Sequence, residues 1–187
     1  MSSQKLRNAV DLHRSGRLDS AKKLYEELIA EDPHNTEAMS NLAVIAISDR
    51  DFVLAERILL SVLEIKKHPH SYSNLGVALK AQGRLSEAII AQQKAIELDS
   101  EFADAYHNLG NALREQGQAA AAVAAYGKVV ALKPKSSDAL NCLGNALKDE
   151  GRLEEAKGAY TKAIELGPEN AEAYNNYAAA LQDERGL

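Results

Sequence analysis

Apolar residues recur along this chain at the spacing of one helical face. In the stretch 104–115 they lie three and four positions apart, which predicts an amphipathic helix with one buried side. Gly117 interrupts this pattern, and a second apolar stretch runs over 119–132 before Pro134, because proline disfavours helical geometry in the residue before it. The pattern therefore predicts a helical hairpin.

The same hairpin pattern returns along the chain after 34 residues, as the spacing from "HSYSNLGVALKAQGR" at 70–84 to "DAYHNLGNALREQGQ" at 104–118 shows. A third copy, "DALNCLGNALKDEGR", lies at 138–152. A single hairpin cannot bury its apolar side, so neighbouring hairpins are expected to stack into one continuous array. We expect one array over 1–187, with repeats at 2–35, 36–68, 69–102, 103–136 and 137–170 and a partial repeat or capping helix at 171–187.

Small residues recur at fixed places in both helices of the hairpin. The first helix repeats a glycine at Gly76, Gly110 and Gly144, and the second repeats an alanine at Ala21, Ala55, Ala88, Ala122 and Ala156. Glycine inside a helix costs about 0.5–1 kcal/mol relative to alanine, so its recurrence predicts a helix that approaches closely at that place.

The two ends of the array depart from the pattern. Lys5 and Asn8 stand where apolar residues are expected and would face a preceding repeat, so we expect the first unit to be the N-terminal end of the array. The helix at 171–187 is either a solvating cap or part of a longer protein. Gly186 and Leu187 begin the next turn, which favours the second interpretation.

The pattern resembles the tetratricopeptide repeat in its Leu-Gly pair, its small alanines, its aromatic in the second helix and its late proline. In the fifth unit these places are Leu140, Leu143-Gly144, Leu147, Ala156, Tyr160, Ala163 and Pro168. The resemblance covers essentially the whole chain and implies an all-α fold, a right-handed superhelical solenoid of antiparallel helix pairs. One departure is Arg50, which replaces the turn glycine of the second unit.

The other side of the first helix is polar, and in this family that side lines a concave groove. At one position on this side, the successive repeats carry Arg7, Asn41, Asn74, Asn108, Cys142 and Asn176. An asparagine amide both donates and accepts, so a row of asparagines can bind the backbone of an extended peptide. This row resembles the asparagine ladder in the repeat region of the nucleocytoplasmic O-linked N-acetylglucosamine transferase. We predict a peptide-binding groove that contains Asn41, Asn74, His107, Asn108, Asn111, Arg114, Asn141, Asn145, Lys148, Asn175 and Asn176.

The predicted groove changes character along its length. One position of the repeat carries Val10, Val44 and Val77 in the first three units and asparagine in the next two. Another position carries the cations Lys80, Arg114 and Lys148 in the third to fifth units. A ligand with one apolar end and an acidic stretch would suit this order. The acidic residues Glu115, Asp149 and Asp183 lie beside the cations, so local ion pairing is the simpler interpretation, and exposed pairs of that kind contribute little to stability.

Composition excludes several classes of partner. The chain has 187 residues, a net charge of −5 and no basic block, so we expect no binding to nucleic acid and none to an anionic membrane surface. A single cysteine excludes an internal disulfide, and no apolar run approaches the length of a secretory signal or a membrane span. These features predict a cytoplasmic protein.

No motif in the sequence predicts catalysis, a metal or a cofactor. His68-Pro69-His70 and His107 lack the cysteine or carboxylate spacing of a metal site and are interpreted as polar turn and groove surface. Cys142 has no histidine beside it in sequence and is expected to be inert. Members of this family that bind the C-terminal carboxylate of a large chaperone use a lysine on the first helix. No lysine occurs at that position of the repeat here, which holds Leu6, Ser40, Ser73, His107, Asn141 and Asn175.

We therefore predict a protein–protein interaction scaffold that is not an enzyme and binds an extended peptide segment in its groove. Two alternatives stay open. In the first alternative, the chain is the substrate-docking region of a larger enzyme such as a glycosyltransferase. In the second, it self-associates through the apolar face of the last helix, which carries Tyr174, Tyr177 and Leu181.

Overall fold

The structure is a computed structural model that describes residues 2–184. Over these residues the protein is all-α and contains no strand, as predicted. The helices are α1 (Ser2–Arg14), α2 (Leu18–Glu31), α3 (Thr36–Ser48), α4 (Phe52–Ile65), α5 (Pro69–Ala81), α6 (Leu85–Leu98), α7 (Ala103–Glu115), α8 (Ala119–Leu132), α9 (Ser137–Asp149), α10 (Leu153–Leu166) and α11 (Ala171–Glu184). None of the helices in this part of the chain is both long enough and apolar enough to cross a membrane.

Each hairpin turns through a residue in the left-handed region of backbone space. Four of these residues are glycines, at positions 16, 83, 117 and 151, with φ between +77° and +81°. Arg50 adopts φ 62° at the same place in the second hairpin. The missing glycine therefore leaves the turn geometry intact, at the cost of a strained arginine.

Side-chain caps fix the start of several helices. The side chains of Asn35, Asp51 and Ser136 accept from the backbone N–H three residues later, at the N-termini of α3, α4 and α9. These bonds satisfy donors that the first turn of a helix otherwise leaves open.

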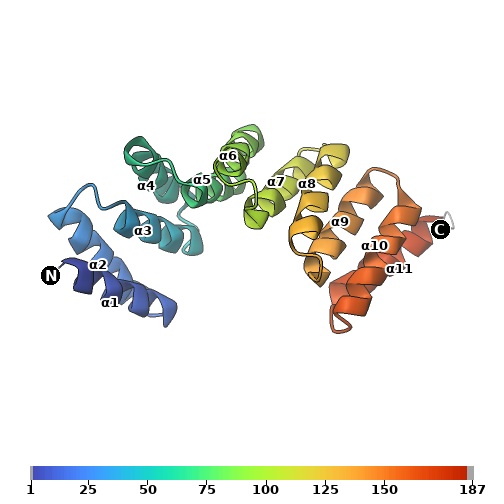
Figure 1. The fold of residues 1–187 in the computed structure, drawn as a ribbon, viewed down its shortest axis with the longest axis horizontal. Coiled ribbons are helices and arrows are strands. Elements are labelled where there is room, and N and C mark those ends of the chain that lie inside the picture. The colour runs from blue at the N-terminus through green and yellow to red at the C-terminus, as the bar shows by residue number, and fades with distance from the viewer. Residues whose placement is uncertain (1, 185–187) are drawn as a thin grey trace. The chain divides into compact units, whose positions relative to one another are not determined.

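The chain forms two compact units, Met1–Leu98 and Asp99–Leu187. In the first, the hairpins α1–α2, α3–α4 and α5–α6 stack one after another (Figure 1). Its core crosses the repeat boundaries, because Ala9 and Tyr25 of the first hairpin share a cluster with Leu42 and Ile45 of the second.

In the second unit the hairpins α7–α8 and α9–α10 stack, and α11 packs against both α9 and α10 (Figure 1). Tyr160 of α10 shares a buried cluster with Leu147 of α9 and Ala180 of α11. The stacking predicted from the sequence is therefore observed within each unit, since a hairpin buries its apolar side against the next one.

The recurring glycines mark close helix contacts, as predicted. A Cβ atom added at Gly110 would lie 2.8 Å from the ring of Tyr126, and one added at Gly144 would lie 2.5 Å from the ring of Tyr160. Both rings belong to the second helix of the same hairpin and are fully buried. The recurring alanines of the second helix are buried as well.

At the N-terminal end, Lys5 is held by two acidic side chains of its own hairpin. Its ammonium group pairs with Glu27 at 2.5 Å and Glu31 at 2.9 Å on α2, the partner helix of its own hairpin. At the other end, the predicted turn at Gly186 and Leu187 lies outside the described residues.

Candidate functional site

The residues predicted to bind peptide all lie on the first helix of a repeat or on α11, and in each unit we name the surface that carries them the first-helix face. In the first unit it carries Asn41 on α3 and Asn74 on α5. In the second unit it carries His107, Asn108, Asn111 and Arg114 on α7, Asn141, Asn145 and Lys148 on α9, and Asn175 and Asn176 on α11. Neighbouring first helices are in contact within each unit, namely α3 with α5, α7 with α9, and α9 with α11.

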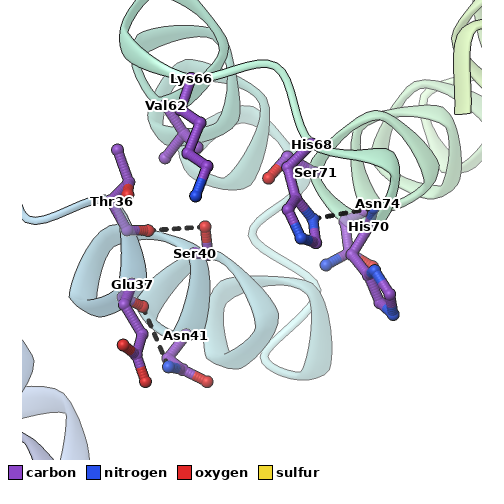
Figure 2. Close-up of a pocket in the computed structure, with 10 residues that line it drawn as sticks. All are labelled: Thr36, Glu37, Ser40, Asn41, Val62, Lys66, His68, His70, Ser71 and Asn74. Carbon is purple, nitrogen blue, oxygen red and sulfur yellow. Dashed lines mark hydrogen bonds between the residues drawn. The ribbon is translucent and has the colours of Figure 1, made fainter. Parts of the chain in front are cut away.

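On the first unit's face, a pocket of about 360 Å³ brings Asn41 and Asn74 together (Figure 2). This volume lies near the lower end of the range for ligand sites, about 300–1,000 Å³, and suits a side chain or a short segment. The lining residues are Thr36, Glu37, Ser40 and Asn41 of α3, Val62 of α4, Lys66 and His68 between α4 and α5, and His70, Ser71 and Asn74 of α5.

Hydrogen bonds inside the pocket leave part of the amide groups open. The Asn41 amide nitrogen donates to the backbone oxygen of Glu37 at 2.9 Å, and the Ser40 hydroxyl donates to the backbone oxygen of Thr36 at 2.7 Å (Figure 2). Within residues 2–184, the Asn41 side-chain oxygen and the whole Asn74 amide have no hydrogen-bond partner. These groups can bind an external donor or acceptor.

Charged and titratable groups surround these amides. The Lys66 side chain extends from the end of α4 into the space between Ser40 and His68 (Figure 2), and it forms no ion pair with any described residue. Burial lowers the pKa of His68, and the nearby His70 and Lys66 lower it further. The His68 Nδ1 accepts from the backbone N–H of His70 at 3.3 Å, so the neutral ring carries its proton on Nε2.

On the second unit's face, two asparagines hold buried tyrosines. The Tyr126 hydroxyl donates to Asn111 Oδ1 at 2.7 Å, and the Tyr160 hydroxyl donates to Asn145 Oδ1 at 2.8 Å. Burial raises the pKa of Tyr160 to about 12. The oxygens of Asn111 and Asn145 therefore satisfy buried hydroxyls of the second helices, a partner that sequence spacing did not reveal.

A chain of hydrogen bonds continues from Asn111 to the cysteine. Asn111 Nδ2 lies 3.3 Å from His107 Nδ1, and His107 Nε2 lies 3.6 Å from Cys142 Sγ. Because the Asn111 oxygen accepts from Tyr126, its nitrogen donates to Nδ1, which assigns the ring proton to Nε2, facing the sulfur.

This histidine–cysteine pair is neutral. Burial lowers the pKa of His107 and raises the pKa of the Cys142 thiol. Both shifts oppose the thiolate–imidazolium pair that a nucleophilic cysteine requires. In the described part of the chain, no group of three or more histidine, cysteine or acidic side chains is placed to hold a metal ion.

The remaining asparagines differ in exposure. Asn176 Nδ2 donates to Asn141 Oδ1 at 3.0 Å, and Asn141 is only 3% exposed. The side chain of Asn108 hydrogen-bonds to His107, whereas Asn175 is exposed on α11. Contacts within and between repeats thus occupy much of this face.

The cations of the second unit pair across repeats. Arg114 Nε lies 2.5 Å from Asp149 Oδ2, and Lys148 Nζ lies 3.8 Å from Asp183 Oδ2. The sequence indicated local pairing, and the observed partners come from the next repeat, 35 residues further along the chain.

Of the ten lining residues of the pocket, only Asn41 and Asn74 belong to the predicted site, and the residues that it lacks include Glu37, Lys66 and His68. Lys66 and His68 lie between helices, where the helical period gives no information about direction. The only signal in the sequence is the polar cluster Lys66-Lys67-His68, placed directly before the proline that starts α5.

Comparisons with known proteins agree with this architecture. The chain is 33% identical over 86 residues to tetratricopeptide repeat protein 7B of Homo sapiens, an alignment that covers 46% of this chain and 10% of that protein. The structure of the MamA protein, at 26% identity, matches 91% of this chain and 94% of its own with a TM-score of 0.78. YrrB, a TPR protein with an unusual peptide-binding site, has the same fold at 20% identity, with 91% of this chain and 89% of its own covered and a TM-score of 0.76.

Family models match most of the sequence. The model described as "Tetratricopeptide repeat" matches residues 12–78, and the model described as "TPR repeat" matches residues 76–113, 110–149 and 144–183. These ranges take in both units and all the residues of the first-helix face. The protein belongs to the tetratricopeptide repeat family.

Proposed function

We propose that this protein is an interaction scaffold that binds an extended peptide along its first-helix face. The observation that carries this proposal is the pocket between α3 and α5, where the Asn41 oxygen and the Asn74 amide are open beside Lys66. The tetratricopeptide fold itself suggests a protein–protein interaction scaffold, and YrrB offers a family example with a peptide-binding site.

An extended peptide has the groups that such a pocket can bind. Its backbone N–H would donate to the Asn41 oxygen, and Asn74 would bind one N–H and one C=O. Each bond contributes about 0.5–1.5 kcal/mol, so two asparagines give useful but modest affinity. In this mode of binding the pair would act as a short asparagine ladder that binds the peptide through its backbone.

The second unit would take part differently. We assign peptide contact there to Asn175, which is exposed, and to the edges of His107, Arg114 and Lys148. Asn111, Asn145 and the Asn141–Asn176 pair would keep the face rigid, because their amides bind other side chains.

A display selection of random peptides on the full chain tests the proposal. Selected peptides are resynthesised and titrated against the wild type, the double variant N41A/N74A, and Asn8→Ala, an exposed asparagine of α1 outside the pocket. The double variant should lose about tenfold in affinity, and Asn8→Ala should lose none. Equal binding to the wild type and N41A/N74A would remove the two asparagines from the binding surface.

A further inference from the structure

A second groove lies in the first unit, over α5 and between α4 and α6, with a volume of about 310 Å³. We name it the α4–α6 groove, and it shares no residue with the pocket on the first-helix face. Its lining consists of Glu56 and Leu60 of α4, Tyr72, Leu75 and Leu79 of α5, and Arg84, Glu87, Ile90, Ala91 and Lys94 at and within α6.

The α4–α6 groove has an apolar floor and exposed apolar walls. Leu75, Leu79 and Ala91 are buried, whereas Leu60 is 47% exposed and Ile90 is 50% exposed. Exposed aliphatic side chains are ordinary when scattered singly, but here two of them flank the same hollow.

The other repeats show that the fold does not require these two side chains. The place of Leu60 is taken elsewhere by Glu26, Gln93, Gly127 and Thr161. The place of Ile90 is taken elsewhere by Lys23, Arg57, Ala124 and Gly158. Polar or small residues thus serve equally well in hairpins of the same geometry, and the exposed Leu60 and Ile90 need another explanation.

The charged groups at the Arg84 end of the groove pair with one another, whereas Lys94 has no acidic partner among residues 2–184. Arg84 donates to Glu56 at 2.6 Å and to both oxygens of Glu87, and Gln82 donates to the remaining Glu56 oxygen at 2.9 Å. Lys94 Nζ lies 5.7 Å from the centre of the Tyr72 ring, and no carboxylate among residues 2–184 pairs with it. A carboxylate from outside would complement this end.

We propose that the α4–α6 groove docks a segment of a partner protein that presents two neighbouring aliphatic side chains and one carboxylate. The aliphatic groups would lie between Leu60 and Ile90 on the apolar floor, and the carboxylate would pair with Lys94. This surface is separate from the peptide site proposed on the first-helix face, so one chain would hold two different partners.

Matched substitutions taken from the other repeats test the docking surface. The double variant Leu60→Gln with Ile90→Lys installs residues that the same places hold in α6 and α2, and it should keep the wild-type melting profile. A phage library of random peptides is selected on the full wild-type chain and counter-selected on this variant. The retained peptides should share two aliphatic residues and an aspartate or glutamate.

Titration of a resynthesised peptide of this kind decides the outcome. Lys94→Gln, an exposed change that leaves the apolar walls intact, should weaken binding about two- to fivefold, the double variant about tenfold or more, and N41A/N74A not at all. Three results would each overturn the proposal: no peptide that distinguishes wild type from variant, a consensus without aliphatic and acidic residues, or unchanged affinity in Lys94→Gln. Sedimentation showing a wild-type dimer that the double variant loses would instead identify a second copy of this chain as the occupant.

Discussion

Single glycines decide how closely the two helices of a hairpin approach. At Gly144 the Tyr160 ring occupies the space where a methyl group would stand, at 2.5 Å from the added Cβ. At Gly158, which is also helical, an added Cβ meets nothing within 4 Å. The same substitution is therefore expected to have opposite effects at the two positions.

Gly144→Ala should destabilise the protein although alanine favours helices, because the buried Tyr160 ring has to move, at a cost of about 1–3 kcal/mol. Gly158→Ala should stabilise it by about 0.5–1 kcal/mol, the usual gain of alanine over glycine inside a helix. Urea-unfolding midpoints of the two variants check both signs. A stabilised Gly144→Ala would show that the ring contact does not limit the approach.

Tyr160→Phe should reduce the loss of stability at alkaline pH. The folded pKa of about 12 lies above the ordinary value of 10.0, so from pH 10 to 12 the unfolded chain releases a proton that the folded chain keeps. This contribution is complete below pH 10 and is lost as the pH rises, and phenylalanine removes it. Unfolding midpoints below and above pH 10 measure the difference, with Tyr174→Phe, at a residue that is 48% exposed, as the control.

Cys142 should react slowly with thiol reagents in the folded protein at neutral pH. Burial raises its pKa, and the neutral His107 beside it supplies no positive charge to stabilise a thiolate. With a disulfide reagent such as DTNB we expect a rate about tenfold or more below that of the urea-unfolded chain. A folded rate equal to or above the unfolded one would indicate an activated cysteine.

At the scale of elements, the hairpin turns show how the array tolerates a deviation from its pattern. Arg50 holds the left-handed conformation that glycine holds in the other hairpins, with φ 62° against 77° for Gly83. The hairpin closes because the stacked helices fix the turn, and the arginine stores the strain locally.

Arg50→Gly should therefore stabilise the protein by about 0.5–1 kcal/mol, the strain relieved less the entropy lost by glycine. The reciprocal change, Gly83→Ala, should destabilise it by about 1 kcal/mol through backbone strain alone, because an added Cβ meets no atom within 4 Å. Thermal melting of both variants tests the pair. A destabilised Arg50→Gly would mean that the arginine side chain contributes more than its backbone costs.

Helical periodicity was sufficient to predict the elements and much of the packing. The predicted second helix at 119–132 coincides with α8, and the recurring small residues lie at the helix contacts. The partners of individual polar side chains were not predictable in the same way. Asn111 binds Tyr126 and His107 approaches Cys142 because folding brings together residues that the period of one helix does not relate.

At the scale of the whole molecule, repetition gives each place of the hairpin several versions of the same environment. Places that vary without altering the hairpin, such as those of Leu60 and Ile90, are free to serve binding. Places that keep glycine or alanine hold the helices together. In the first-helix pocket, Ser71 is buried, while Asn41 and Asn74 keep open amide groups beside it.

The central claim is that Asn41 and Asn74 bind an extended peptide, and an NMR titration of their side-chain amides tests it most directly. Signals of the two NH₂ groups are assigned by their loss in Asn41→Ala and Asn74→Ala, and a peptide from the display selection is then added to the wild-type chain. The account predicts that both pairs of signals shift together with the backbone amides of α3 and α5. Unmoved asparagine signals, while residues elsewhere in the chain respond to the bound peptide, would contradict it.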